Sequence, residues 1–188
     1  MFAVTMNAAA MRAAGVNGAP GGSRPLAVDW TAVRRLANAP VNQRGQAVNA
    51  KFIAANRGGI NSVTIPVLLP GEPDLAPGLR FFPNGDFYTV SSSSNGMSFV
   101  LSGAGRAFPL PPATARGLPN GSLKSRIPAD GIVIEQTEAG IDASFNRYGA
   151  AYSIALECAK SHDDPRCKDA VYLRGVISRL VVVPGGSI

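Results

Sequence analysis

The sequence lacks the residues and motifs on which most catalytic sites depend. It has one histidine in 188 residues, and His162 lies in a polar stretch beside Ser161, Asp163 and Asp164. Neighbours in sequence rarely form a catalytic relay, and the nucleophile motif G-x-S-x-G does not occur. The P-loop, the Rossmann fingerprint, zinc ligand sets and the EF-hand calcium loop are also missing. The sequence therefore predicts no catalytic, cofactor or metal site.

Long apolar runs are missing as well. No stretch reaches the roughly 18 consecutive apolar residues that a transmembrane helix needs. Charged residues make up 16% and apolar residues 46% of the chain, a balance typical of a globular domain. The 21 glycines and 15 prolines favour many turns and short strands over long helices.

Acidic residues are nearly absent from the first third of the chain. Residues 1–60 contain seven basic side chains and only one acid, Asp29, so the whole net charge of +6 lies there. A basic surface attracts an acidic protein, anionic lipid or nucleic acid. The candidate partner-binding residues of this third are Arg34, Arg35, Arg44 and Lys51. The alternative is that these side chains only solvate helix surfaces.

Two regions carry the alternation that is typical of half-buried strands. Tyr152, Ile154 and Leu156 alternate with small or polar residues, which predicts a strand with one buried face. The stretch 87–94 is similar and precedes Asn95-Gly96, a type I′ hairpin signal. Residues 62–101 and 131–158 together predict an antiparallel β-sheet or sandwich.

Helix signals flank these regions on both sides. Asp29 is a good N-cap for a helix that ends before Pro40, and residues 43–55 form a second predicted helix, with a strand at 51–54 as the competitor. Near the C-terminus, Asp164-Pro165 predicts the start of an amphipathic helix. Its apolar face comprises Ala170, Leu173, Ile177 and Leu180. The fold class predicted is α+β, with N-terminal helices and a C-terminal helix packed on one face of the sheet.

The domain organisation follows from composition. Residues 1–28, rich in alanine and glycine, are expected to be a flexible arm or the remnant of an export signal. Residues 29–188 are long enough for one ordinary domain with its own core, and a single α+β domain is expected there.

The two cysteines lie nine positions apart. Cys158 ends the predicted strand, and Cys167 lies in the first turn of the following helix, which favours a disulfide. Two free thiols remain an alternative, and so does a metal pair with His162, although that set lacks a fourth ligand. A disulfide indicates an oxidising compartment, so a periplasmic or secreted location is expected.

Two further patterns stand out. Asn146, Arg147 and Tyr148 form a strand corner whose charged and aromatic side chains are candidates for a partner-binding groove. An offset of 44 residues superposes Gly96 on Gly140 and Gly105 on Gly149, which predicts two similar β-units side by side.

These features favour a non-catalytic domain of the cell envelope that binds a partner or supports an assembly. The partner expected is an acidic protein or an anionic envelope surface, and no cofactor is expected. The alternative is a hydrolase that acts on an envelope polymer. Its candidate carboxylates are Glu135, Glu138, Asp142 and Glu157. Nucleic-acid binding through the basic residues of 1–60 is the weaker alternative, because it requires a cytoplasmic chain and therefore reduced cysteines.

Overall fold

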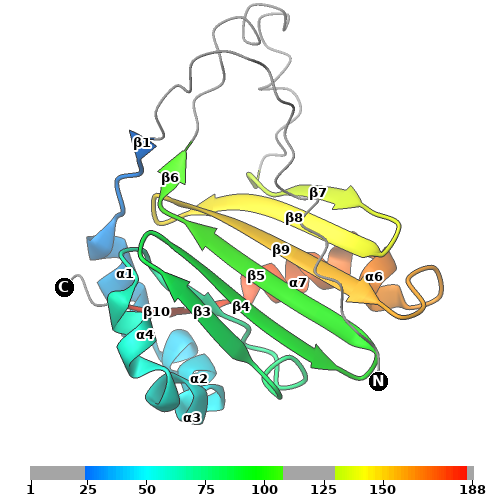
Figure 1. The fold of residues 1–188 in the computed structure, drawn as a ribbon, viewed down its shortest axis with the longest axis horizontal. Coiled ribbons are helices and arrows are strands. Elements are labelled where there is room, and N and C mark those ends of the chain that lie inside the picture. The colour runs from blue at the N-terminus through cyan, green and yellow to red at the C-terminus, as the bar shows by residue number, and fades with distance from the viewer. Residues whose placement is uncertain (1–23, 108–129, 186–188) are drawn as a thin grey trace, which may run out of the picture.

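A six-stranded antiparallel sheet is the centre of the computed structural model, which describes residues 24–107 and 130–185 (Figure 1). The strand order is β3-β4-β5-β9-β8-β7. The strands are β3 (Arg80–Asn84), β4 (Phe87–Ser94), β5 (Met97–Ala104), β7 (Val133–Gln136), β8 (Gly140–Arg147) and β9 (Ala150–Cys158). The predicted α+β class with an antiparallel sheet is thus confirmed, as one sheet rather than a sandwich.

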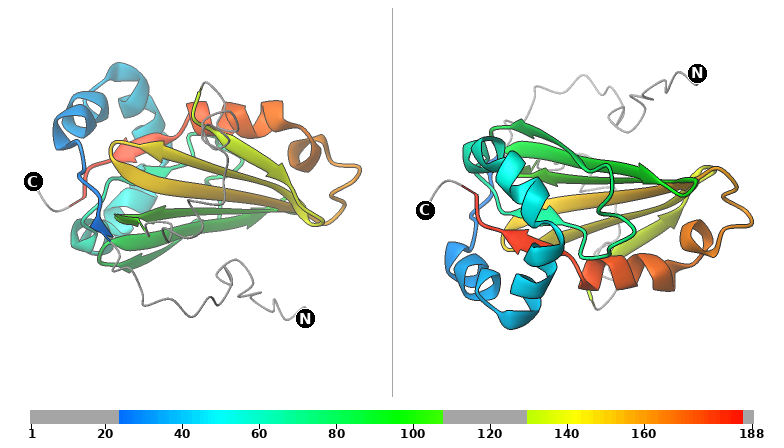
Figure 2. Two further views of the ribbon diagram at one scale, coloured as in Figure 1. Left: turned by 90° about the horizontal axis from the view of Figure 1, so that it is seen from above. Right: turned by 90° about the horizontal axis from the view of Figure 1, so that it is seen from below.

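The remaining elements lie around this sheet. The helices are α1 (Trp30–Ala37), α2 (Pro40–Val48), α3 (Ala50–Ala55), α4 (Arg57–Ser62), α6 (Pro165–Lys168) and α7 (Ala170–Ser178). Two small antiparallel pairs join β2 (Val67–Leu69) to β10 (Val181–Val183) and β1 (Arg24–Pro25) to β6 (Arg106–Ala107). Figure 2 shows α1, α7 and β10 on the same side of the sheet.

The alternating sequence pattern determines which face of the sheet is buried. Along β9, Tyr152, Ile154 and Leu156 are buried, whereas Ser153 and Glu157 are exposed on the opposite face. Successive strand residues point to opposite faces, so a single buried layer fills the space between the sheet and the helices. Leu173, Val176 and Ile177 of α7 belong to the same core, which confirms that the C-terminal helix packs on one face.

The helices begin where the aspartates predict. Asp29 accepts a hydrogen bond from the Ala32 amide at 2.9 Å and caps α1. Asp164 accepts from the Arg166 amide at 3.0 Å and caps α6. The predicted C-terminal helix is interrupted, however, because the Asp169 carboxylate accepts from the Val171 amide at 2.7 Å and starts α7 as a second helix.

The second predicted helix, 43–55, is divided between α2 and α3, and the strand alternative at 51–54 is wrong. The division falls at Asn49, whose buried side-chain amide donates to the Pro70 carbonyl at 2.9 Å. The sequence Gly58-Gly59 lies inside α4 and does not end a helix.

The predicted arm, residues 1–28, lies mostly outside the described residues. Its last part reaches the fold, since β1 pairs with β6.

Two tyrosines connect the sheet to β2. The Tyr88 hydroxyl accepts from the Leu68 amide at 2.7 Å, and the Tyr152 hydroxyl donates to the Pro66 carbonyl at 3.0 Å. Both rings lie over Gly103, where an added Cβ atom would come within 2.5 Å of the Tyr88 ring and 3.1 Å of the Tyr152 ring. Burial raises the pKa of both hydroxyls above the usual tyrosine value, so they stay protonated at neutral pH.

The sheet contains a structural repeat, but its offset is 53 residues rather than 44. The strands β3, β4 and β5 begin at Arg80, Phe87 and Met97, and β7, β8 and β9 begin 53 positions later. Leu101 pairs with Ile154, the residue 53 positions later. The two halves of the sheet are therefore related by an approximate two-fold axis that passes through this pair. Matching left-handed turns at Asn95-Gly96 and Tyr148-Gly149 join the paired strands. The offset of 44 is wrong because it matches a turn residue, Gly96, to the first residue of β8.

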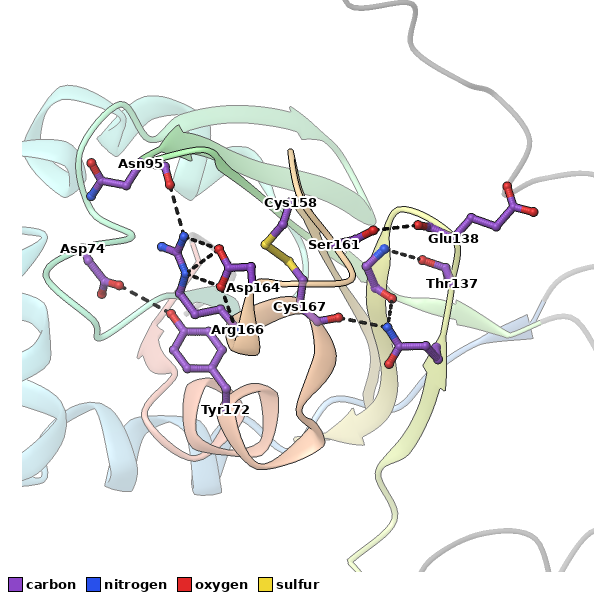
Figure 3. The surroundings of a disulfide bond; sticks show 12 residues. Asp74, Asn95, Thr137, Glu138, Cys158, Ser161, Asp164, Arg166, Cys167 and Tyr172 are labelled. Atoms are coloured by element: carbon purple, nitrogen blue, oxygen red, sulfur yellow. Dashed lines mark hydrogen bonds and ion pairs between the residues drawn. A yellow bond between two sulfur atoms is a disulfide. The ribbon is translucent and has the colours of Figure 1, made fainter.

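The predicted disulfide is present. Cys158 of β9 and Cys167 of α6 are bonded, with their Cα atoms 6.0 Å apart (Figure 3). Neighbouring hydrogen bonds hold α6 against two hairpins: Arg166 donates to the Asn95 carbonyl, and Gln136 donates to the Cys167 carbonyl.

Among the described residues, no helix has the length and apolar character needed to cross a bilayer.

Candidate binding groove

A groove of about 550 Å³ lies between the N-terminal helices and the junction of α7 with β10. The turn between β8 and β9 closes it on a third side. Fourteen residues line it: Leu36, Ala39, Val41, Asn42, Arg44, Gly45, Val48, Gly71, Arg147, Tyr148, Ser178, Arg179, Leu180 and Val181. We refer to this site as the helix–strand groove.

The groove depends on close packing of α2 against β10. A side chain at Gly45 would collide with Val181, so glycine allows the helix to approach the strand. Asn42 then bonds both backbone groups of Val182: its Nδ2 donates to the carbonyl at 2.9 Å, and its Oδ1 accepts from the amide at 2.8 Å. Gln46 donates to the same carbonyl at 3.0 Å. These contacts occupy the edge of β10 that faces α2.

Exposed apolar side chains gather in this groove. Val41 is 73% exposed, Val48 44% and Leu36 37%. Among the described residues, only Phe82 and Val171 are other large apolar side chains with comparable exposure. Single exposed apolar residues are ordinary, but three that converge on one concavity indicate a binding surface.

Three arginines and a tyrosine surround the apolar residues. Arg147 donates to the Ile177 carbonyl at 3.1 Å, and its guanidinium lies 5.4 Å from the centre of the Phe145 ring. Tyr148 follows in a left-handed conformation, with φ of 54°. Arg44 is exposed on α2 and makes no ion pair with the described residues. No acidic residue lines the groove, so the charged side chains that line it are all basic.

Arg179 is held at the groove by a buried carboxylate. Its Nε lies 2.7 Å from Oε1 of Glu72, a side chain only 8% exposed. The other oxygen, Oε2, has no hydrogen-bond partner among the described residues. Burial raises the pKa of Glu72, and the neighbouring Arg179 only partly offsets that effect. The Arg179 side chain is nevertheless 57% exposed.

The structure brings together some of the predicted binding residues and separates others. Arg44, Arg147 and Tyr148 line the same groove although they come from distant parts of the sequence. Arg34, Arg35 and Lys51 are exposed on α1 and α3 but do not line it. Asn146 lies on the other face of the sheet, in a shallower hollow with Ser144 and Ser153.

Sequence reasoning missed the apolar part of the groove and Arg179. A signal was nevertheless present, because Val41, Gly45 and Val48 repeat at intervals of four and three residues, which places them on one helix face. What the sequence does not contain is the position of that face relative to β10.

The candidate carboxylates of the hydrolase alternative lie at the other side of the sheet. Glu135 and Asp142 are direct cross-strand partners on β7 and β8, on the face away from α7. The pKa of Asp142 is raised first by partial burial and then by the charges of Glu157 and Glu135. No acidic side chain of this group lines the helix–strand groove.

Replacing Asp142 with asparagine is expected to stabilise the fold at neutral pH. The raised pKa means that the ionised carboxylate is less favourable in the folded chain than in the unfolded chain. That penalty is complete above the folded pKa and absent below the unfolded value of 3.8. The free energy of unfolding of Asp142→Asn should exceed that of the wild type by about 0.2–1 kcal/mol near pH 7, the range for one cross-strand pair of charges. The difference should vanish near pH 3.

Urea unfolding at the two pH values measures this effect. Glu138→Gln is the matched control, because Glu138 is an exposed carboxylate in the turn between β7 and β8. It should leave the free energy of unfolding nearly unchanged at both pH values. A loss of stability at neutral pH in Asp142→Asn would show that the carboxylate makes a favourable contact instead.

No metal centre emerges from residues 24–107 and 130–185, where no three histidine, cysteine or acidic side chains are grouped to hold an ion. The groove itself offers apolar side chains, arginine donors and the side chain of Tyr148. Comparison of the chain with protein-family models, curated proteins and solved structures finds no match, so the functional argument depends on this geometry.

Proposed function

We propose that this protein is a non-catalytic binding domain of the cell envelope or the secreted fraction, and that it holds an anionic partner in the helix–strand groove. The observation that carries the proposal is the convergence of Leu36, Val41 and Val48 with Arg44 and Arg179 in one concavity. Exposed apolar area provides binding free energy, and arginines select for negative charge.

The two cysteines support the envelope or secreted location. A disulfide persists in oxidising compartments such as the periplasm and the extracellular space. Cys158 and Cys167 are bonded, and no free cysteine occurs among the described residues. A partner in these compartments meets the basic surface as an acidic protein or as anionic lipid.

Sedimentation with lipid vesicles tests binding to an anionic surface. The full chain should sediment with vesicles of phosphatidylcholine plus phosphatidylglycerol at low salt, but not with phosphatidylcholine alone. Each arginine near the headgroups contributes about 1 kcal/mol. Binding should weaken as salt shortens the screening length to roughly 3 Å at 1 M.

Two charge reversals locate the binding surface. Arg44→Glu should reduce vesicle binding strongly, because Arg44 lines the groove, whereas Arg34→Glu with Arg35→Glu should reduce it less, since these side chains lie outside it. Equal losses would place the contact on the general basic surface and contradict a groove site. Salt-sensitive binding to DNA without vesicle binding would favour the nucleic-acid alternative.

One observation supports the hydrolase alternative: the pKa of Asp142, which lies beside Glu135 and Glu157, is raised. A carboxyl group with a raised pKa is suited to act as a general acid. Release of soluble fragments from dye-labelled peptidoglycan by the protein, and its loss in Asp142→Asn, would support this alternative. We place it second because these carboxylates do not line the helix–strand groove.

A further inference from the structure

The chemistry of the groove restricts what it can hold, if the proposed function is right. We infer that its ligand is a single-chain anionic amphiphile: an alkyl chain that ends in a carboxylate or phosphate group. Three independent properties of the groove point to this class.

The first property is the occupied strand edge. An extended peptide binds to a sheet by adding a strand, which needs free backbone amides and carbonyls. Here the amide and carbonyl of Val182 are both bonded to Asn42, and the carbonyl also accepts from Gln46. An extended peptide therefore cannot pair with β10 at Val182. An alkyl chain needs no backbone partner.

The second property is size. The groove has fourteen lining residues and a volume of about 550 Å³, which lies within the range of about 300–1,000 Å³ that is typical of small-molecule sites. That volume is large enough for one alkyl chain.

The third property is the combination of apolar and basic side chains in one concavity. Leu36, Val41 and Val48 offer only apolar contact. Arg44 lies on the same helix between Val41 and Val48 and supplies a cationic group, and no lining residue is acidic. An amphiphile with one negative end matches both parts, since its chain covers the apolar residues and its head group pairs with a guanidinium. A cationic or zwitterionic head would gain less.

Titration calorimetry of the full chain with laurate, kept below its micelle concentration, tests the inference. We expect one bound laurate per protein. Dodecanol keeps the chain and loses the charge, and acetate keeps the charge and loses the chain. Both should bind at least tenfold more weakly than laurate. Lysophosphatidylglycerol with the same chain length distinguishes a phospholipid source from a free fatty acid.

Variants locate the ligand in the groove. Val41→Asp and Arg44→Glu should each weaken laurate binding at least tenfold, and both side chains are exposed, so the fold should tolerate them. Arg34→Glu is the matched control and should change the affinity less than twofold, because Arg34 lies outside the groove.

Binding that ignores Val41→Asp and Arg44→Glu would overturn the inference, because the amphiphile would then sit elsewhere. So would equal affinity for laurate and dodecanol, which would show that the head group is not recognised. If neither laurate nor the lysophospholipid binds while vesicle binding still depends on Arg44, this inference is wrong and the proposed function stands. If vesicle binding fails as well, the inference is wrong and an anionic lipid surface is excluded as the partner of the proposed function.

Discussion

Replacing Leu173 with alanine is expected to lower the free energy of unfolding by about 2–5 kcal/mol. Leu173 is fully buried on α7, in the same core as Ile154 and Leu156 of the central strand β9. Removal of its side chain leaves a cavity that the sheet cannot fill, because Ile154 and Leu156 are fixed by pairing with β5 and β8. Urea unfolding followed by circular dichroism measures the loss.

The same helix provides the control. Val171 is 72% exposed, and Val171→Ala should change the free energy of unfolding by less than about 0.5 kcal/mol. If Leu173→Ala costs no more than this control, α7 does not pack on the sheet as described. A large loss in both variants would instead indicate that the helix is sensitive to any substitution.

Local signals in the sequence predict most of the strands and caps. Asn95-Gly96 predicts a type I′ hairpin, and both residues have positive φ in the structure. The alternation in 152–156 predicts the buried face of β9, and Asp29 and Asp164 mark helix starts. Each of these features depends on residues within a few positions of one another, so the sequence carries the information directly.

Features that depend on distant contacts are not predictable in this way. The offset of 44 arises from common glycines, whereas the offset of 53 is recognised only from the pairing of Leu101 with Ile154. Gly103 needs its small size because two tyrosine rings, one from β4 and one from β9, lie over it. The groove is not predictable from local sequence either, because Arg44, Arg147 and Arg179 line it only through the packing of α2, β8 and the end of α7.

The break at Asp169 shows how a local signal and a distant contact compete. Apolar spacing from Ala170 to Leu180 predicts one continuous helix from Pro165. In the structure α6 stops after one turn, at the point where Cys167 is bonded to β9 and its carbonyl accepts from Gln136 of β7. Asp169 then caps a second helix. The disulfide fixes α6 to the sheet, and α7 takes its direction from the core.

Removal of this disulfide is expected to lower the free energy of unfolding by roughly 2–3 kcal/mol in the chain-entropy model for so short a loop. Cys158→Ala with Cys167→Ala removes both sulfurs without leaving a buried thiol. Local opening of α6 should also become easier, because the Arg166 and Gln136 hydrogen bonds then hold that helix alone (Figure 3). Amide hydrogen exchange should accelerate most in 165–168, and the best-protected amides of the β5–β9 pairing should lose only the amount by which the global free energy of unfolding falls.

Intact mass after alkylation provides the direct check on the native bond. Protein prepared without reductant should take up no alkylating reagent, and reduced, unfolded protein should take up two equivalents, one for each cysteine in the chain. Reductant should lower the free energy of unfolding of the wild type by the amount seen in the double variant, because reduction and the two substitutions open the same loop. Two alkylated cysteines in the protein prepared without reductant would contradict the disulfide. They would also remove the argument for an oxidising compartment, and the basic surface would then have to be judged against cytoplasmic partners, nucleic acid among them.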